Sequence, residues 1–131
     1  MLKMKVAKLS VVGAMALGGI GTVVLGAGSA SAATAASTLG CASGFVCIYN
    51  TYDDVVNGNV QARFEAYGAN NLTNEFGDKW IFNNQYGGDN ATAVLCYGYN
   101  GVNCDGNYTI YNEGLAEFNL TPFNSIWLNR P

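Results

Sequence analysis

From residue 40 onward, short apolar runs alternate with polar segments. Valine, isoleucine, threonine and aromatic residues are concentrated in the runs, whereas asparagine, glycine and aspartate lie between them. Runs of this length and composition predict β-strands, and no stretch after residue 40 has the periodicity of an amphipathic helix. The predicted strands are GFVCIY (44–49), NVQARFEAY (59–67), KWIFNN (79–84), TAVLCYGY (92–99), YTIY (108–111) and SIWLN (125–129).

Turn residues separate these predicted strands at short intervals. The segments NGN (57–59), YGGDN (86–90) and NCDGN (103–107) combine glycine with asparagine or aspartate, the residues that tight turns favour. Many short strands with turns throughout predict an all-β domain, either a sandwich or a small barrel.

A weak internal repeat divides the domain into two halves. Each half contains Asn-Leu-Thr, then a phenylalanine and then a tryptophan-containing strand, at 71–76 with Trp80 and at 119–123 with Trp127. Two such copies predict two Greek-key units packed face to face. We expect their tryptophans and phenylalanines to fill the core, at about 150–250 Å² of buried area for each ring.

The first 32 residues have the pattern of a secretory signal peptide. Lys3, Lys5 and Lys8 precede an uncharged run, VVGAMALGGIGTVVLGAG, which ends near the small residues Ala30 and Ala32. This arrangement predicts cleavage after Ala32, and no stop-transfer flank supports the alternative of a membrane anchor. We therefore expect a signal peptide at 1–32, a flexible tail at 33–40, one domain at 41–131, and a secreted, extracellular product.

Removal of the signal peptide would leave an acidic protein. The remaining chain has three basic residues, Arg63, Lys79 and Arg130, and nine acidic residues, which gives a net charge of −6. A surface of this charge repels phosphate groups, so neither a nucleic acid nor an anionic membrane is expected as a partner.

The four cysteines, Cys41, Cys47, Cys96 and Cys104, all lie in the predicted domain. An even number in an exported protein predicts two disulfides, for which three pairings are possible. We favour Cys41–Cys47 and Cys96–Cys104 because each pair is local. A zinc site is disfavoured, since the chain has no histidine and the cysteine spacings do not match zinc knuckles.

Catalytic chemistry has little support in the sequence, and we expect neither an enzyme nor a cofactor. The chain has no histidine to act as a base, no G-x-S-x-G motif and no phosphate-binding loop. Asp53 and Asp54 are adjacent carboxylates, but a glycosidase needs two acids on opposite sides of a cleft.

Three segments, CASGFVCIY, YGANNLT and the closing FNSIWLNRP, resemble a family of secreted actinobacterial proteins. This is peptidase inhibitor family thirty-six, typified by the streptomycete metalloproteinase inhibitor, and the resemblance covers roughly residues 41–130. It implies a βγ-crystallin-like fold of two Greek-key motifs, two disulfides and inhibition of proteases. In the family's characterised inhibitor, the reactive site lies in a loop bounded by the second disulfide.

Calcium binding is a further property of βγ-crystallin modules. Their ligands come from a stretch resembling Asn/Asp-Asp-x-x-Ser-Ser, of which this chain retains Asp78, whereas Ile81 and Phe82 occupy the hydroxyl positions. We therefore expect no strong metal site and keep Asp53, Asp54 and Asp78 as weak calcium candidates.

The segment 97–103 is the candidate contact loop. Bounded by Cys96 and Cys104, it is uncharged and aromatic, and its Asn-Gly pair favours a tight hairpin turn. We expect a monomer whose stapled loop enters the cleft of an extracellular metalloprotease, or of a serine protease. The alternative is a non-inhibitory extracellular binding or structural module, with a weak calcium or antimicrobial role. The nominated contact residues are Tyr97, Tyr99, Asn100, Gly101 and Val102, with Val102 as the apolar anchor.

Overall fold

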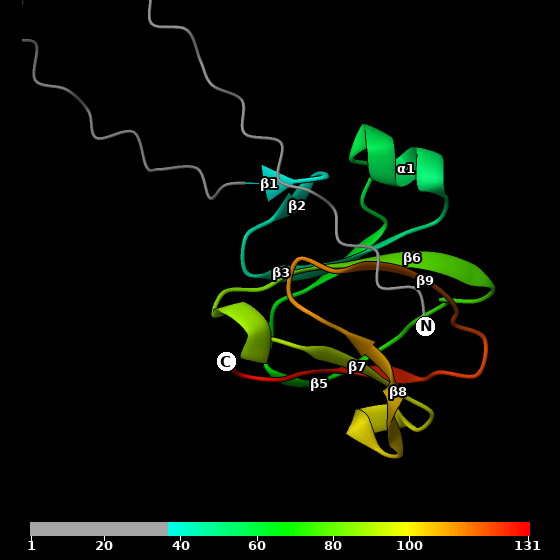
Figure 1. Cartoon of the computed structure of the whole chain (residues 1–131). Coiled ribbons are helices and arrows are strands. Elements are labelled where there is room, and N and C mark those ends of the chain that lie inside the picture. The colour runs from blue at the N-terminus through cyan, green and yellow to red at the C-terminus, as the bar shows by residue number, and fades with distance from the viewer. Residues whose placement is uncertain (1–36) are drawn as a thin grey trace, which may run out of the picture.

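The structure, a computed structural model, describes residues 37–131, which form two four-stranded antiparallel sheets and a small two-stranded one (Figure 1). The fold is mostly β-sheet with few helices. The strands are β1 (Ser37–Thr38), β2 (Cys41–Ala42), β3 (Phe45–Tyr49), β4 (Ala62–Phe64), β5 (Gly68–Asn71), β6 (Asp78–Asn84), β7 (Ala93–Cys96), β8 (Cys104–Ile110), β9 (Leu115–Asn119) and β10 (Ser125–Leu128). The helices are α1 (Tyr52–Asn57) and the 3₁₀ turns η1 (Gly88–Asn90) and η2 (Tyr99–Gly101).

Each half of the domain contributes one strand to the other half's sheet. One sheet has the order β4-β3-β6-β9 and the other β5-β10-β7-β8. Strand β9 comes from the second half but pairs with β6, and β5 comes from the first half but pairs with β10. The two halves therefore cannot separate without breaking two strand ladders.

The two sheets face each other across the main core, and a second core lies on the outer side of one sheet. Val46 and Ile48 of β3 belong to the cluster between the sheets. Cys47 and Tyr49, which alternate with them, belong to a second cluster that includes Val55 of α1. Since both faces of β3 are covered, its continuous apolar run is accounted for. Figure 1 shows α1 on this outer side.

Three predicted strands, 44–49, 79–84 and 125–129, are confirmed as β3, β6 and β10. The other three are shorter or displaced: 59–67 contains only β4, 92–99 ends as a strand at Cys96, and 108–111 is the end of β8. The predicted turn at 103–107 is wrong, because β8 already begins at Cys104. Cys104 lies directly opposite Cys96 in the β7–β8 ladder, so their disulfide joins the pair of residues next to the connecting loop.

The helix α1 was not predicted, because the sequence after residue 40 shows no amphipathic helical stretch, and it contains the first residue of the predicted turn 57–59. Thr51 caps it, since the Thr51 Oγ1 accepts from the Asp54 N–H at 3.1 Å and the Asp54 carboxylate accepts from the Thr51 N–H. Gly58 ends the helix with φ of 71°. A helix of six residues is too short to show an amphipathic period.

Both tryptophans lie outside the main core, which corrects the sequence-based expectation. Trp80 is half-buried, with its ring centroid 5.1 Å from that of Tyr52. Trp127 lies between Ile126 and Leu128, which take the inward positions of β10, so strand alternation directs Trp127 outward. Phe82 and Phe123 are buried as predicted, whereas Phe76 is exposed.

The predicted signal peptide at 1–32 and its cleavage site lie outside the described residues. Within the predicted tail at 33–40, β1 pairs with β2, and the Leu39 carbonyl accepts a 2.7 Å hydrogen bond from the Tyr49 hydroxyl. Burial raises the pKa of that hydroxyl to about 12. In the described part of the chain, no helix has the length and apolar character needed to cross a membrane.

Glu75, between β5 and β6, is an unexpected buried acid. Only 5% of the residue is exposed, and its Oε2 has no hydrogen-bond partner in the structure. Burial raises the pKa of this carboxyl above its usual range, although the nearby Lys79 partly opposes the shift. The folded state therefore binds the proton more tightly than the unfolded chain does.

We expect Glu75→Gln to raise the free energy of unfolding by about 1 kcal/mol at pH 7, because burying the unpaired carboxylate is costly. The native protein should lose stability as the pH rises through the unfolded pKa, about 4.3, and on to the folded pKa. Denaturant unfolding from pH 4 to pH 8 measures this, and the variant's advantage should vanish near pH 4. Glu65→Gln, at an exposed position, is the control; an equal gain there would contradict the prediction.

Candidate functional site

The segment 97–103 forms the connection between β7 and β8, and a disulfide closes its base. Cys96 and Cys104 are direct partners across the ladder, with Cα atoms 3.7 Å apart. The second disulfide joins Cys41 to Cys47. Both favoured pairings are thus present. We call residues 97–103 the stapled loop.

The backbone of the stapled loop folds back on itself in a tight turn. The Tyr97 N–H donates to the Asn103 carbonyl at 3.1 Å, and the Gly98 N–H donates to the Val102 carbonyl at 2.9 Å. At the tip, Asn100 and Gly101 have φ of 58° and 75°. Positive φ at both central residues is the geometry that an Asn-Gly hairpin turn adopts.

Side chains from elsewhere in the chain hold the loop backbone against the β5-β10-β7-β8 sheet. The Asn71 amide makes two bonds with Asn100: its Oδ1 accepts from the backbone N–H at 2.8 Å, and its Nδ2 donates to the Asn100 Oδ1 at 3.1 Å. The buried Ser125 Oγ accepts from the Gly101 N–H at 3.0 Å and donates to the Gly98 carbonyl at 2.6 Å. The loop is therefore anchored at its tip as well as at its base.

The nominated residues of the loop have different environments. The Tyr97 ring stacks on Phe123 with centroids 4.8 Å apart, and the Asn124 Nδ2 donates to the Tyr97 carbonyl at 2.7 Å. Tyr99 and Val102 are 58% and 54% exposed. Tyr97 therefore supports the loop, whereas Tyr99 and Val102 are available to a partner.

Gly101 is in close contact with the exposed tryptophan of β10. A Cβ atom on Gly101 would lie 2.4 Å from the Trp127 ring, which is too close for any larger residue without movement. Three neighbours of the loop were not predicted from the sequence: Asn71, Ser125 and Trp127. Asn71 belongs to the first Asn-Leu-Thr repeat, and Ser125 and Trp127 belong to the strand that follows the second. These positions indicated that the two halves are similar, but they did not indicate contact with the loop.

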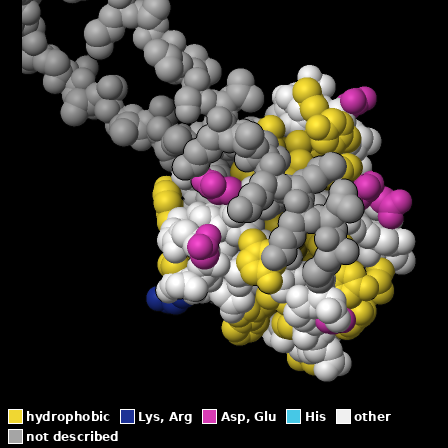
Figure 2. All heavy atoms as spheres, in the orientation of Figure 1, with side chains coloured by type: hydrophobic (Ala, Val, Ile, Leu, Met, Phe, Trp, Pro, Cys, Tyr) yellow, Lys and Arg dark blue, Asp and Glu magenta, His cyan; other side chains and the backbone are white. Residues whose placement is uncertain are grey.

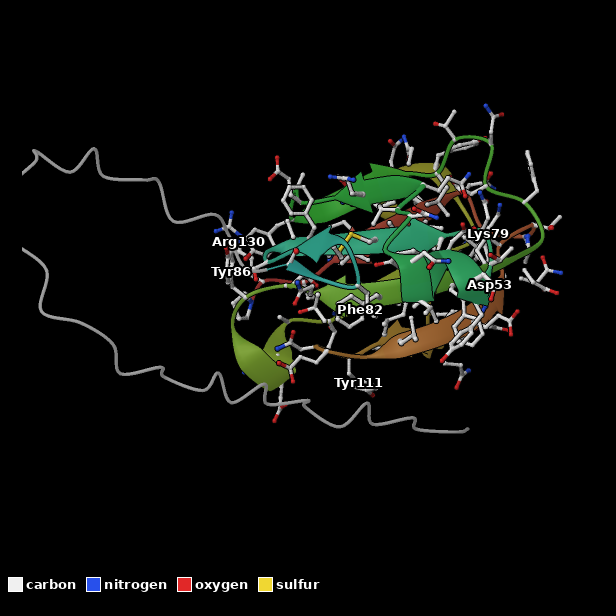
Figure 3. All side chains as sticks on the ribbon, turned by 90° about the horizontal axis from the view of Figure 1, so that it is seen from above. Asp53, Lys79, Phe82, Tyr86, Tyr111 and Arg130 are labelled. Atoms are coloured by element: carbon white, nitrogen blue, oxygen red, sulfur yellow. A yellow bond between two sulfur atoms is a disulfide. The ribbon has the colours of Figure 1, made fainter. Side chains whose placement is uncertain are left out.

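The weak calcium candidates are not brought together into a site. Asp54 is occupied by the cap of α1, while Asp53 and Asp78 are exposed. Within residues 37–131, no group of three or more histidine, cysteine or acidic side chains could hold a metal ion. In Figure 1, α1 and the stapled loop lie at opposite ends of the molecule. Figure 3, which views the molecule from above, shows Asp53 of α1 at the opposite end from Arg130, the residue before the C-terminal one.

The surface is sparsely charged and mainly acidic. In Figure 2, acidic side chains are scattered over the visible face, whereas basic side chains are seen only at its edge. The stapled loop itself carries no charged residue.

Comparisons of the chain with protein-family models, curated proteins and solved structures found no match.

Proposed function

We propose that the protein is a secreted inhibitor of extracellular proteases, with metalloproteases as the first expected target. The stapled loop would enter the protease cleft. One observation carries this proposal: two exposed apolar side chains, Tyr99 and Val102, project from a backbone held by a disulfide and by side-chain hydrogen bonds. A loop that is already ordered loses little conformational freedom on binding, which favours affinity.

Val102 is the residue best placed to act as the apolar anchor. Its φ of −86° and ψ of 137° are extended, whereas Gly101 and Asn103 on either side have left-handed φ values. The extended backbone at Val102 resembles that of a bound substrate. This extended segment is one residue long, because the loop turns tightly on either side of it. Thermolysin-like enzymes prefer an apolar residue after the cleaved bond, which Val102 would supply.

The exchange of strands between the two halves supports the proposed relationship to peptidase inhibitor family thirty-six. Two four-stranded sheets, each completed by a strand from the other half, are the arrangement expected of paired Greek keys in a βγ-crystallin-like fold. We include this fold, and the family, in the proposal. The two disulfides indicate an oxidising setting, in agreement with an extracellular location.

The test is a titration of the purified, oxidised protein against a thermolysin-like metalloprotease and a subtilisin-like serine protease. We expect stoichiometric inhibition of the metalloprotease and at least about a 30-fold weaker inhibition constant for Val102→Asp, since a central apolar anchor is worth about 2 kcal/mol or more. Val56→Asp is the matched control, because Val56 is 63% exposed but lies on α1, away from the loop.

Ser125→Ala examines the role of the ordered backbone. It leaves Tyr99 and Val102 in place but removes both bonds that Ser125 makes to the loop. Inhibition should weaken by about tenfold, the equivalent of about 1.4 kcal/mol. If the unaltered protein inhibits neither protease at micromolar concentration, the proposal fails, and the non-inhibitory binding module becomes the better interpretation.

A further inference from the structure

The outer face of the β5-β10-β7-β8 sheet has a flat aromatic centre between two shallow hollows. Trp127 is 38% exposed and lines both hollows, as does Asn129. One hollow, of about 310 Å³, is also lined by Val94, Gly101 and Cys104. The other, of about 360 Å³, is also lined by Tyr67, Gly68, Leu128 and Arg130. We call this surface the Trp127 face.

The indole of Trp127 is held in a defined position on this face. Its partners on the two neighbouring strands are Ala69 and Val94, which are too small to cover it. The indole Nε1–H donates to the Asn129 Oδ1 at 3.0 Å, and Gly101 packs against the ring. An exposed aromatic ring fixed in this way offers an apolar plate without the cost of ordering it at binding.

Asn129 adds polar groups beside this plate. Its Nδ2 donates to the Thr92 Oγ1 at 2.9 Å, and its Oδ1 accepts from the indole. A side-chain amide has two donor hydrogens and two acceptor lone pairs, so one of each remains for a ligand. Hydroxyl groups, which both donate and accept, match this pair.

The backbone and the charges of the face disfavour two other ligand classes, a peptide that adds a strand and a cation. Strand β10 is paired on both sides, with β5 and with β7, so a peptide cannot add a strand over Trp127. Arg130 is the charged residue among those that line the hollows, and its guanidinium lies 5.1 Å from the centroid of the Tyr67 ring. With no carboxylate among the lining residues, a cationic ligand has no counter-charge.

We propose that the Trp127 face binds a polysaccharide, namely a flat β-1,4-linked chain of pyranose rings. The C–H face of one ring stacks on Trp127, its hydroxyls pair with the Asn129 amide, and the next rings in each direction lie in the two hollows. Both hollows are shallow, whereas a small-molecule site buries most of its ligand, so they suit sugar rings that lie on the surface. The Trp127 face adjoins the stapled loop, since Gly101 lines one of the hollows, but saccharide binding there does not require protease inhibition.

The test uses the fluorescence of Trp127 itself. The chain has two tryptophans, so a Trp80→Phe background leaves Trp127 as the reporter. Titration with chitohexaose and with cellohexaose should give a saturable change in emission with at least one of them. By calorimetry, Trp127→Ala should weaken binding at least about tenfold and Asn129→Ala about threefold to tenfold. Tyr111→Ala, an exposed aromatic position immediately after β8, is the matched control and should bind normally.

Three outcomes would overturn the proposal. They are no emission change with millimolar concentrations of either hexasaccharide, unchanged binding in Trp127→Ala, or binding lost equally in Tyr111→Ala. If Trp127→Ala does not fold, the fluorescence titration and Asn129→Ala still decide the question. Val102→Asp should bind the saccharide normally while losing inhibition, so failure of the two proposals can be distinguished; loss of saccharide binding in that variant would place the site on the loop instead.

Discussion

Replacement of Asn83 by alanine is expected to lower the free energy of unfolding by about 3–5 kcal/mol, because each buried polar group left without a partner costs about 1–3 kcal/mol. Asn83 is fully buried in β6, and its Nδ2 donates to the carbonyls of Ala91 and Ile110 at 2.8 and 2.9 Å. Its Oδ1 accepts from the Gln85 N–H at 3.1 Å. The Asn83 side chain thus satisfies three backbone groups, and its bond to the Ile110 carbonyl of β8 links the two sheets.

Asn84→Ala is the matched control for this prediction. Asn84 is the next residue of β6, and its Nδ2 makes one bond, to the Cys41 carbonyl at 2.9 Å. We expect a loss of about 1 kcal/mol, the usual net value of one hydrogen bond. Urea unfolding of both variants, followed by fluorescence, gives the comparison. Equal losses would show that the network around Asn83 has no special role.

Gly40→Ala is expected to cost about 3–5 kcal/mol, as the sum of backbone strain and steric overlap. The φ of Gly40 is 73°, a value that residues with a side chain rarely adopt. A Cβ at this position would lie 2.2 Å from the Gly58 carbonyl oxygen. Because the obstacle is backbone at the end of α1, it cannot move aside as a flexible side chain would.

Gly77→Ala separates these two contributions. Gly77 has φ of 72°, and a Cβ added there would meet no atom within 4 Å. It should therefore show the strain alone, about 1–2 kcal/mol. Thermal unfolding of both variants measures the difference. If Gly40→Ala is no worse than Gly77→Ala, then the segment before β2 does not pack tightly against the end of α1.

Local patterns in the sequence predicted the elements that depend on local chemistry. The strands at 44–49, 79–84 and 125–129 have the composition and length that a pleated strand requires, and each was found. The Asn100-Gly101 turn and the two local disulfides also follow from short-range chemistry. The stapled loop was therefore identified from sequence as a candidate site.

Strands β5 and β9 were not predicted, and their neighbouring strands stabilise them. Strand β5 has the sequence GANN, whose glycine and asparagines are residues that turns favour, yet it pairs along β10. Strand β9 is likewise recruited by β6. Conversely, the segment 59–67 has strand composition, but β4 covers only three of its residues. In each case the neighbouring strand decides, because a ladder supplies hydrogen bonds to whichever segment lies beside it.

The sequence by itself determined that this is a β-rich chain with two local disulfides and an uncharged loop between Cys96 and Cys104. Only the tertiary structure decided how that loop is held and what surrounds it. Asn71 and Asn100 are 29 residues apart, and they meet because β5 crosses into the sheet of the second half. The same exchange places Ala69 beside Trp127 and leaves the indole exposed. Composition and spacing report on neighbours along the chain, whereas contacts of this kind depend on which strands become neighbours in space.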